Sequence, residues 1–172
     1  MPEGLEAFRA LARAGEDLFR LHADYEELEL WPLEVEEAPG APEDPYQRFR
    51  IEQPRLDAAK RVIRYNDWIT IRGLPEAAFT WRPGGYGPLE WIVRYWRVAT
   101  KVEGPPKRRI IWDPNHVLRD TQNSRYLLEL VGKAVRASVK TQEILASMDA
   151  CIDRLKSADI TDLPLLVTTR QT

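Results

Sequence analysis

Residues 64–115 read RYNDWITIRGLPEAAFTWRPGGYGPLEWIVRYWRVATKVEGPPKRRIIWDPN, and this stretch decides the fold. It holds five of the six tryptophans in the chain, interleaved with arginine. Tryptophan and arginine gathered on a compact region are typical of a surface that contacts a polyanion. Short alternating runs between Gly, Pro and Asn-Asp turn signals predict small β-strands here rather than long helices.

The strand-rich core is predicted over residues 48–115. Residues 48–52, which alternate polar and apolar side chains, and residues 78–82 predict two short strands. Residues 62–66 and 68–71 flank an Asn-Asp turn, so they form either a hairpin or one bulged strand. A helix is predicted over 88–98, where Pro88 suits the first turn. We expect residues 99–115 to be mostly loop.

Two long helices are predicted outside this core, over residues 4–30 and 123–156, from apolar residues at three- and four-residue steps. The second has a narrow apolar seam typical of packing on another helix, and the first helix is the expected partner. Residues 32–47, acidic and rich in proline, predict a linker. The expected fold is a single α+β domain over 1–172: a small, mostly antiparallel sheet with a short helix, packed with two long helices.

Charge is distributed unevenly along the chain. The net charge is −2 overall, but residues 1–54 carry −9, residues 55–112 carry +7 and residues 113–172 carry zero. A basic middle can attract phosphates even when the whole chain is near neutral. No apolar run is long enough for a membrane span and no signal peptide is recognised, so we expect no membrane association and a cytoplasmic protein.

Signals for catalysis are weak. The only histidines, His22 and His116, are far apart in the sequence, and the only cysteine, Cys151, fits a small apolar filler in a helix. Neither a zinc-ligand pattern nor a phosphate-binding P-loop occurs. We therefore expect no catalytic residue, no metal and no cofactor in this chain.

Basic segments are the better lead to function. One group is Arg55, Lys60, Arg61 and Arg64, and a second is Lys107-Arg108-Arg109, which follows two prolines. Such residues contact phosphates, while Arg or Asn can reach base edges. An ordinary solvated surface, in which arginine stems cover apolar side chains, explains them as well. The candidate DNA contacts are Arg61, Arg64, Asn66, Arg82, Lys101, Lys107, Arg108 and Arg109.

Several motifs in a fixed order resemble a known family. LHADYE (21–26), YND (65–67), GLP (73–75), LEWI (89–92) and DPN (113–115) together resemble the C-terminal specificity region of the single-chain Type ISP restriction-modification enzymes. The sequence differs from that family before LEWI, where it has Gly85-Tyr86-Gly87-Pro88, and in the longer, basic GPPKRRIIW before DPN. Both differences lie where proteins that read different targets are expected to diverge.

The resemblance implies a DNA target-recognition module that holds duplex DNA for an adenine methyltransferase and nuclease located elsewhere. S-adenosylmethionine, ATP and Mg²⁺ are then expected only in those other parts of the restriction system. The expected partners are double-stranded DNA and the methyltransferase and helicase-nuclease portion of the same system.

Two other interpretations stay open from the sequence. In one, the long helices dock this piece onto the methyltransferase or helicase part, and DNA is contacted elsewhere. In the other, the chain is a small stand-alone hydrolase. The sequence leaves open the DNA target, the oligomeric state and whether the chain is a fragment of a larger protein.

Overall fold

A computed structural model describes residues 3–157 of the chain. The chain divides into two compact units. Unit 1 comprises residues 1–24 and 140–172, and unit 2 comprises residues 25–139. The last helix, α6 (Tyr126–Ser157), contributes its first part to unit 2 and its remainder to unit 1.

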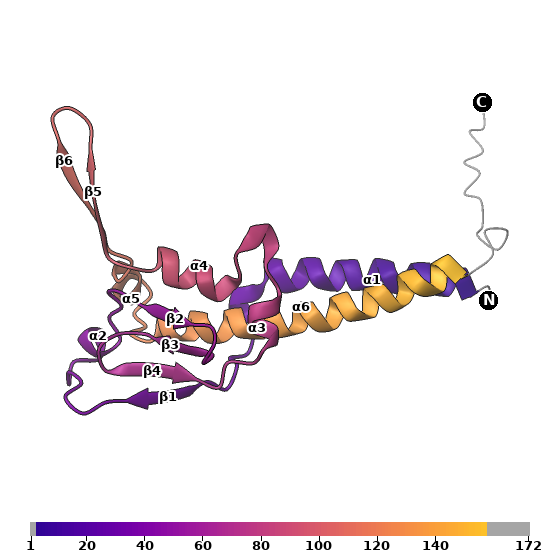
Figure 1. Ribbon diagram of the computed structural model, residues 1–172, viewed down its shortest axis with the longest axis horizontal. Helices are drawn as coiled ribbons and strands as arrows, with labels where there is room; N and C mark the ends of the chain where they lie inside the picture. The colour runs from indigo at the N-terminus through magenta and orange to yellow at the C-terminus, as the bar shows by residue number, and fades with distance from the viewer. Residues whose placement is uncertain (1–2, 158–172) are drawn as a thin grey trace. The chain divides into compact units, whose positions relative to one another are not determined.

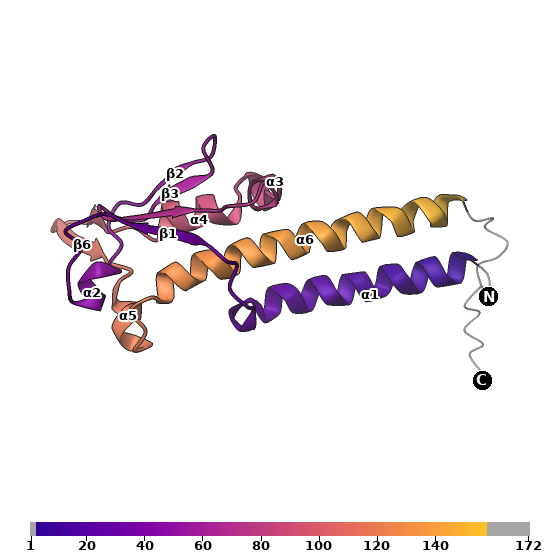
Figure 2. The ribbon, with the colours of Figure 1, turned by 90° about the horizontal axis from the view of Figure 1, so that it is seen from below.

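Unit 1 is a pair of helices, α1 (Glu3–Ala23) and the second part of α6, which lie side by side in Figures 1 and 2. Ala7, Ala14 and Leu21 recur at seven-residue spacing on α1 and are buried, as are Thr141 and Cys151 of α6. His22 Nε2 lies 3.2 Å from Thr141 Oγ1. The pairing of the two long helices is as the sequence predicts, and Cys151 is a free, buried cysteine.

The first helix ends at Ala23 instead of continuing to residue 30, and only a short 3₁₀ turn follows, η1 (Tyr25–Glu27). In unit 2 the carbonyls after this point are bound by side chains of α6. Lys133 donates to the Glu26 carbonyl at 2.5 Å, and Arg136 donates to the carbonyls of residues 29 and 30. Because these side chains satisfy the carbonyls, the chain can leave the helix without leaving these three carbonyls unpaired.

Unit 2 is built on a four-stranded antiparallel sheet in the order β1-β4-β3-β2. The strands are β1 (Glu34–Glu37), β2 (Arg55–Asp57), β3 (Val62–Arg64) and β4 (Ile69–Arg72). β3 and β4 form the hairpin that was one of the two arrangements predicted for residues 62–71. The other elements are α2 (Pro45–Arg48), α3 (Ala77–Thr80), η2 (Pro83–Gly85), α4 (Pro88–Tyr95), β5 (Ala99–Glu103), β6 (Arg108–Trp112) and α5 (His116–Asp120).

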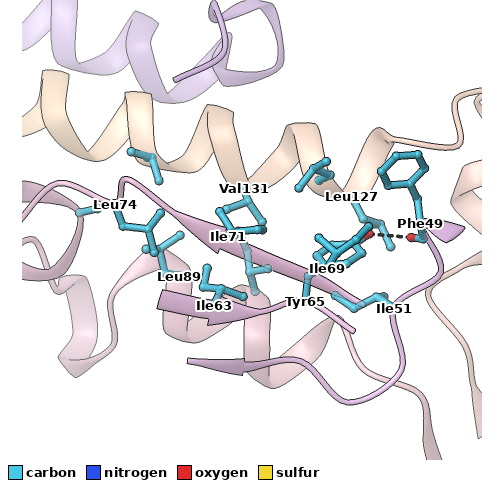
Figure 3. Close-up of a cluster of buried hydrophobic side chains, with 14 of the residues drawn as sticks. Phe49, Ile51, Ile63, Tyr65, Ile69, Ile71, Leu74, Leu89, Leu127 and Val131 are labelled. Carbon is cyan, nitrogen blue, oxygen red and sulfur yellow. Dashed lines mark hydrogen bonds between the residues drawn. The ribbon is translucent and has the colours of Figure 1, made fainter. Parts of the chain in front are cut away.

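The core of unit 2 lies on one face of this sheet. Figure 3 shows Ile69 and Ile71 of β4 facing Leu127 and Val131 of α6. Leu89 of α4 and residues from the neighbouring loops complete the cluster. The opposite face of the sheet carries polar side chains, as the alternation of β4 predicts. The α+β class expected from the sequence is therefore observed.

The segment predicted as a linker, residues 32–47, holds two regular elements. β1 pairs with β4 over four residues, and α2 begins after Asp44, whose side chain accepts a hydrogen bond from the Tyr46 N–H at 3.0 Å. The expectation of a linker is wrong here because the strand's hydrogen bonds are backbone bonds, which an acidic edge strand makes as well as an apolar one.

Residues 48–52, predicted as a strand, form no strand. The N–H groups of residues 48–50 donate to backbone carbonyls of residues 44–47, and side chains satisfy other backbone groups of the segment. Tyr65 Oη donates to the Phe49 carbonyl at 2.8 Å, as Figure 3 shows, and Asn66 Nδ2 donates to the carbonyls of Arg48 and Arg50 at 2.9 Å each. Asn115 holds Ile51 at both ends, accepting from its N–H at 2.8 Å and donating to its carbonyl at 2.7 Å. We call residues 48–51 with these three side chains the polar clamp.

The structure differs from two further predictions. Residues 78–82, expected as a strand, belong mostly to α3, which starts with i to i+3 hydrogen bonds onto Pro75 and Glu76 and contains two alanines, strong helix formers. Residues 99–115, expected as loop, contain the β5–β6 hairpin, which we call the ribbon. The predicted helix 88–98 is confirmed as α4, where Glu90 accepts a hydrogen bond from the Gly87 N–H at 2.7 Å.

Among the described residues, none of the helices has the length and apolar character that crossing a membrane requires.

The clamp makes a testable contribution to stability through Tyr65, which is fully buried. Burial raises the pKa of its phenol above the ordinary value of 10.0. The unfolded chain therefore loses this proton first as pH rises, so the free energy of unfolding should fall above about pH 10 by about 1.4 kcal/mol per pH unit. Tyr65→Phe should remove this contribution and, at neutral pH, cost about 1–3 kcal/mol because the Phe49 carbonyl loses its donor.

Urea unfolding at several pH values measures both effects. Tyr86→Phe is the matched control, because that ring is 43% exposed. Equal losses for the two variants at neutral pH would show that the clamp hydrogen bond does not stabilise the fold.

Candidate nucleic-acid interface

The solvent-facing side of the sheet carries a row of polar residues across all four strands. Arg55 of β2 lies opposite Arg64 of β3, Arg64 lies opposite Thr70 of β4, and Thr70 lies opposite Glu36 of β1. The alternation that buries Ile69 and Ile71 on the core side places Thr70 on the other side. The two arginines are therefore side by side on an exposed surface.

Like charges directly opposite each other destabilise an antiparallel pair. Within the described part of the chain, neither the Arg55 nor the Arg64 side chain has a carboxylate or other partner that would offset this repulsion. An anion bound between them would do so. This pair is the feature of the sheet face that points to a phosphate.

Two adjoining grooves meet at these arginines. The first has a volume of about 650 Å³ and the second about 590 Å³, and Arg55, Arg64 and Thr70 line both. Asn66 and Trp68 lie along the first groove, and Lys60 and Arg72 lie along the second. A polyanion that follows the sheet face would meet the two arginines in both grooves. Carboxylates also line them: Glu52 and Asp67 the first, and Asp57, which pairs with Lys60, the second.

Other cations near the grooves are neutralised within the protein. Arg50 binds Asp113 at 2.6 Å, and Arg72 binds Glu36 at 2.8 Å. Burial works to raise the pKa of Asp113, but hydrogen bonds from the Asn115 backbone and from Arg50 outweigh it, so the pKa lies below its ordinary value. Arg50 is therefore held by a carboxylate that stays ionised, and its charge serves the fold.

The ribbon carries the second basic group. Lys107 lies in its turn, and Arg108 and Arg109 begin β6. All three are exposed, and none has an ion pair or hydrogen bond from its side chain to another residue among those that the structure describes. Lys101 of β5, by contrast, pairs with Glu103 on the same strand.

The remaining candidates have different surroundings. Arg61 is exposed in the β2–β3 turn, with a positive φ of 52°. Arg82 donates to the Gly85 carbonyl at 2.9 Å and pairs with Glu90 at 3.1 Å, which ties it to the start of α4. Asn66 uses its whole amide inside the protein: besides its two donated bonds, its oxygen accepts from the N–H groups of Trp68 and Ile69. In this conformation Asn66 has no free group for a base edge.

An exposed aromatic cluster escaped the sequence-based reasoning. Trp91 and Tyr95 of α4 stack with ring centroids 4.5 Å apart, and Tyr86 meets Trp91 edge-on at 5.9 Å. Arg94 lies 5.1 Å from the Tyr86 ring centroid. The i, i+4 spacing of Trp91 and Tyr95, on the side of the helix away from Leu89 and Ile92, was the signal that could have found it. Trp112 of β6 is also exposed, at 55%.

Metal-ligating side chains are dispersed in the described part of the chain. Across residues 3–157, no three His, Cys, Asp or Glu side chains gather in a group that could hold one.

Comparisons with known proteins show a family match and similar solved structures. The chain matches the family described as Type ISP C-terminal specificity domain over residues 1–130. A comparison with curated proteins gave no match.

Solved structures with the same fold come from much larger chains. A nuclease-deletion mutant of the Type ISP restriction-modification enzyme LlaGI, in complex with a DNA substrate mimic, is 27% identical, with a TM-score of 0.61 over 78% of this chain and 10% of its own. The ATP-dependent Type ISP enzyme LlaBIII bound to DNA is 24% identical, with a TM-score of 0.61 over 79% of this chain and 8% of its own. The DrdV–DNA complex is 22% identical, with a TM-score of 0.57 over 81% of this chain and 14% of its own.

The arginine pair should cost stability in the absence of a ligand. Replacing both residues, Arg55→Gln with Arg64→Gln, removes the repulsion between opposite strands, so the free energy of unfolding should stay the same or rise by up to about 1 kcal/mol. Urea unfolding at low ionic strength, where screening is weakest, measures the change. A clear loss of stability would mean that the two guanidinium groups support the fold.

Proposed function

Because the chain belongs to the family of Type ISP C-terminal specificity domains, we propose that it is a DNA target-recognition module of a restriction-modification enzyme. Its ligand is duplex DNA, which it contacts through unit 2. The observation that carries this proposal is the pair Arg55 and Arg64, which face each other across two strands on the open side of the sheet and have no side-chain partner within residues 3–157.

We assign phosphate contact to the sheet face and reading of bases to the ribbon. Charged side chains that contact phosphates fix the register of a protein on the duplex but carry no sequence information. Arg55 and Arg64 on the rigid sheet suit that positioning role, because the core holds their strands from behind. Reading of bases requires side chains that reach into a groove. The ribbon is an exposed projection of unit 2, and three of its cations have no partner in the part of the chain that the structure describes.

The chemistry of modification and cleavage belongs to other parts of such an enzyme. The chain spans about a tenth of the length of the Type ISP structures that it resembles. A methyltransferase that acts on a base must take it out of the stack, which requires the duplex to be held firmly beside it. We assign this holding to the present chain, and S-adenosylmethionine, ATP and Mg²⁺ to the portions that carry out the reactions.

A docking role without DNA contact is less well supported. The helix pair of unit 1 would suit attachment to a larger protein. A docking role alone does not account for the arginine pair or for the cations of the ribbon. The family's description as a specificity domain also favours reading of the target.

Fluorescence anisotropy with a labelled duplex of random sequence tests the proposal. The unmodified chain should bind at low salt and weaken steeply as salt rises. Arg55→Gln with Arg64→Gln should weaken binding and reduce the slope of log K against log salt by about 2, since each lost phosphate contact contributes about 0.9.

Arg13→Gln with Lys140→Gln is the matched control. Both residues are exposed cations of unit 1, so the pair changes the net charge equally. If the control variant loses as much affinity as the sheet variant, the effect comes from overall charge, and the sheet face is not the interface. Absence of duplex binding by the unmodified chain even at low salt would contradict the proposed function itself.

A further inference from the structure

Helix α1 of unit 1 has a second, mostly apolar seam beside the one that is buried. We call it the outer seam, and it consists of Phe8, Ala12, Gly15, Phe19 and His22, which recur at alternating four- and three-residue steps. Such steps keep residues on one side of a helix. Phe8 is 55% exposed and Phe19 is 73% exposed, and Ala12 and His22 are exposed as well. Large apolar side chains gathered on an exposed surface mark a place of association.

The outer seam contains a hollow. Gly15, Leu18, Phe19 and His22 line a hollow of about 520 Å³ and occupy positions i, i+3, i+4 and i+7 of the helix. Four residues spaced in this way form the hole that receives a side chain of a facing helix in knobs-into-holes packing. Gly15 keeps the hollow open, since a Cβ there would have no described atom beyond its own helical turn within 4 Å. Phe8, two turns before Gly15, is an exposed side chain of the kind that fills such a hole.

Knob and hole fit each other when two copies of α1 pack antiparallel. From Phe8 to Phe19, the steps along the outer seam are the same when read from either end. If Phe8 of one copy lies opposite Phe19 of a second copy, each seam residue between them therefore also has a seam residue opposite. Ala12 then faces Gly15, and these small residues let the helices approach closely. Each Phe8 ring enters the hollow of the other copy, so the same patch serves both sides of a two-fold contact.

Charge favours the same register. Arg9 and Glu16 are exposed and each directly follows a seam residue, so both flank the outer seam on the same side. In the antiparallel register, Arg9 of one copy lies within one helical turn of Glu16 of the other, and the two-fold axis forms this pair twice. A parallel register sets Phe8 against Phe8 and leaves the hollow without a knob. A second copy thus supplies the knob, the hole and the opposite charge together.

We propose that the outer seam of α1 binds the same seam of a second copy of this chain in an antiparallel, two-fold contact, with Phe8 of each copy in the hollow of the other. The contact belongs to unit 1, so it is separate from the sheet face and the ribbon and does not rest on the proposed function. The resulting dimer carries two copies of unit 2.

Sedimentation velocity over a wide range of concentrations tests the inference. The unmodified chain should show a reversible equilibrium between monomer and dimer. Phe8→Gln removes the knob from both sides of the contact, so it should raise the dissociation constant at least about tenfold. Ile111→Gln is the matched control, because it removes a side chain of unit 2 that is 60% exposed. The control should dimerise as the unmodified chain does.

Gly15→Gln separates an effect on the dimer from damage to the fold. Glutamine favours a helix more than glycine does, and open space surrounds this position, so the thermal midpoint of unfolding should rise. Circular dichroism at the lowest concentration, where the chain is monomeric, measures that midpoint. The same substitution fills the hollow, so the dissociation constant should also rise at least about tenfold. A substitution that merely disturbed unit 1 would lower the midpoint instead.

Charge reversal tests the register. Arg9→Glu and Glu16→Arg should each weaken the dimer at low salt, because each sets like charges opposite one another. Combined in one chain, they reverse the pair and should restore part of the lost affinity. Arg9 and Glu16 are too far apart along α1 to form a pair within one helix, so the restoration reports a contact between copies.

Three results would contradict the inference. A chain that stays monomeric at every concentration overturns it, and the outer seam is then left to a different partner. Dimerisation that Phe8→Gln and Gly15→Gln leave unchanged overturns it too, because another surface then joins the copies. Equal weakening by Ile111→Gln indicates non-specific association of exposed apolar residues. None of these results bears on duplex binding, which the anisotropy experiment measures separately.

Discussion

The polar clamp is the constraint on which the rest of unit 2 depends. Residues 48–51 run through a mostly buried region without a neighbouring strand, and buried backbone groups must find partners. Tyr65 and Asn66 supply them from the sheet hairpin, and Asn115 supplies them from the segment that follows the ribbon. One short segment therefore ties the sheet to the base of the ribbon.

This arrangement gives a structural role to two of the motifs that resemble the family, YND and DPN. YND and DPN contain the three clamp side chains, Tyr65, Asn66 and Asn115, so they help to build the scaffold that carries the proposed interface. Among the described residues, the unpaired cations of the proposed interface lie outside those motifs, on the sheet face and on the ribbon. A scaffold of this kind allows the reading elements to change between targets, because ribbon side chains that pack against nothing can be replaced without disturbing the core.

Ion pairing divides the cations of unit 2 into two groups. One group is paired with carboxylates of the fold, and the other is available to bind an anion. Arg50, Arg72 and Arg82 are paired with carboxylates, while Arg55 and Arg64 repel each other across two strands. A protein that keeps such a repulsion gives up stability for function, as binding sites commonly do. The near-neutral net charge of the whole chain hides this local difference, which depends on which acid lies beside which base.

The sequence by itself determined the α+β class, the two long helices and α4, because each has a strong local signal of periodicity, turn residues or caps, and it narrowed residues 62–71 to a hairpin or one bulged strand. It also pointed to the family and to a basic middle. Only the tertiary structure decided that residues 48–52 form no strand, that the acidic segment contributes an edge strand, and that residues 99–112 form a projecting ribbon. It alone sorted the basic and polar residues, committing the amide of Asn66 to the clamp and leaving Arg55 and Arg64 without a side-chain partner among the described residues. The reason is physical: hydrogen-bond partners and neutralising carboxylates come from residues distant in the chain, and local sequence does not encode which of them meet.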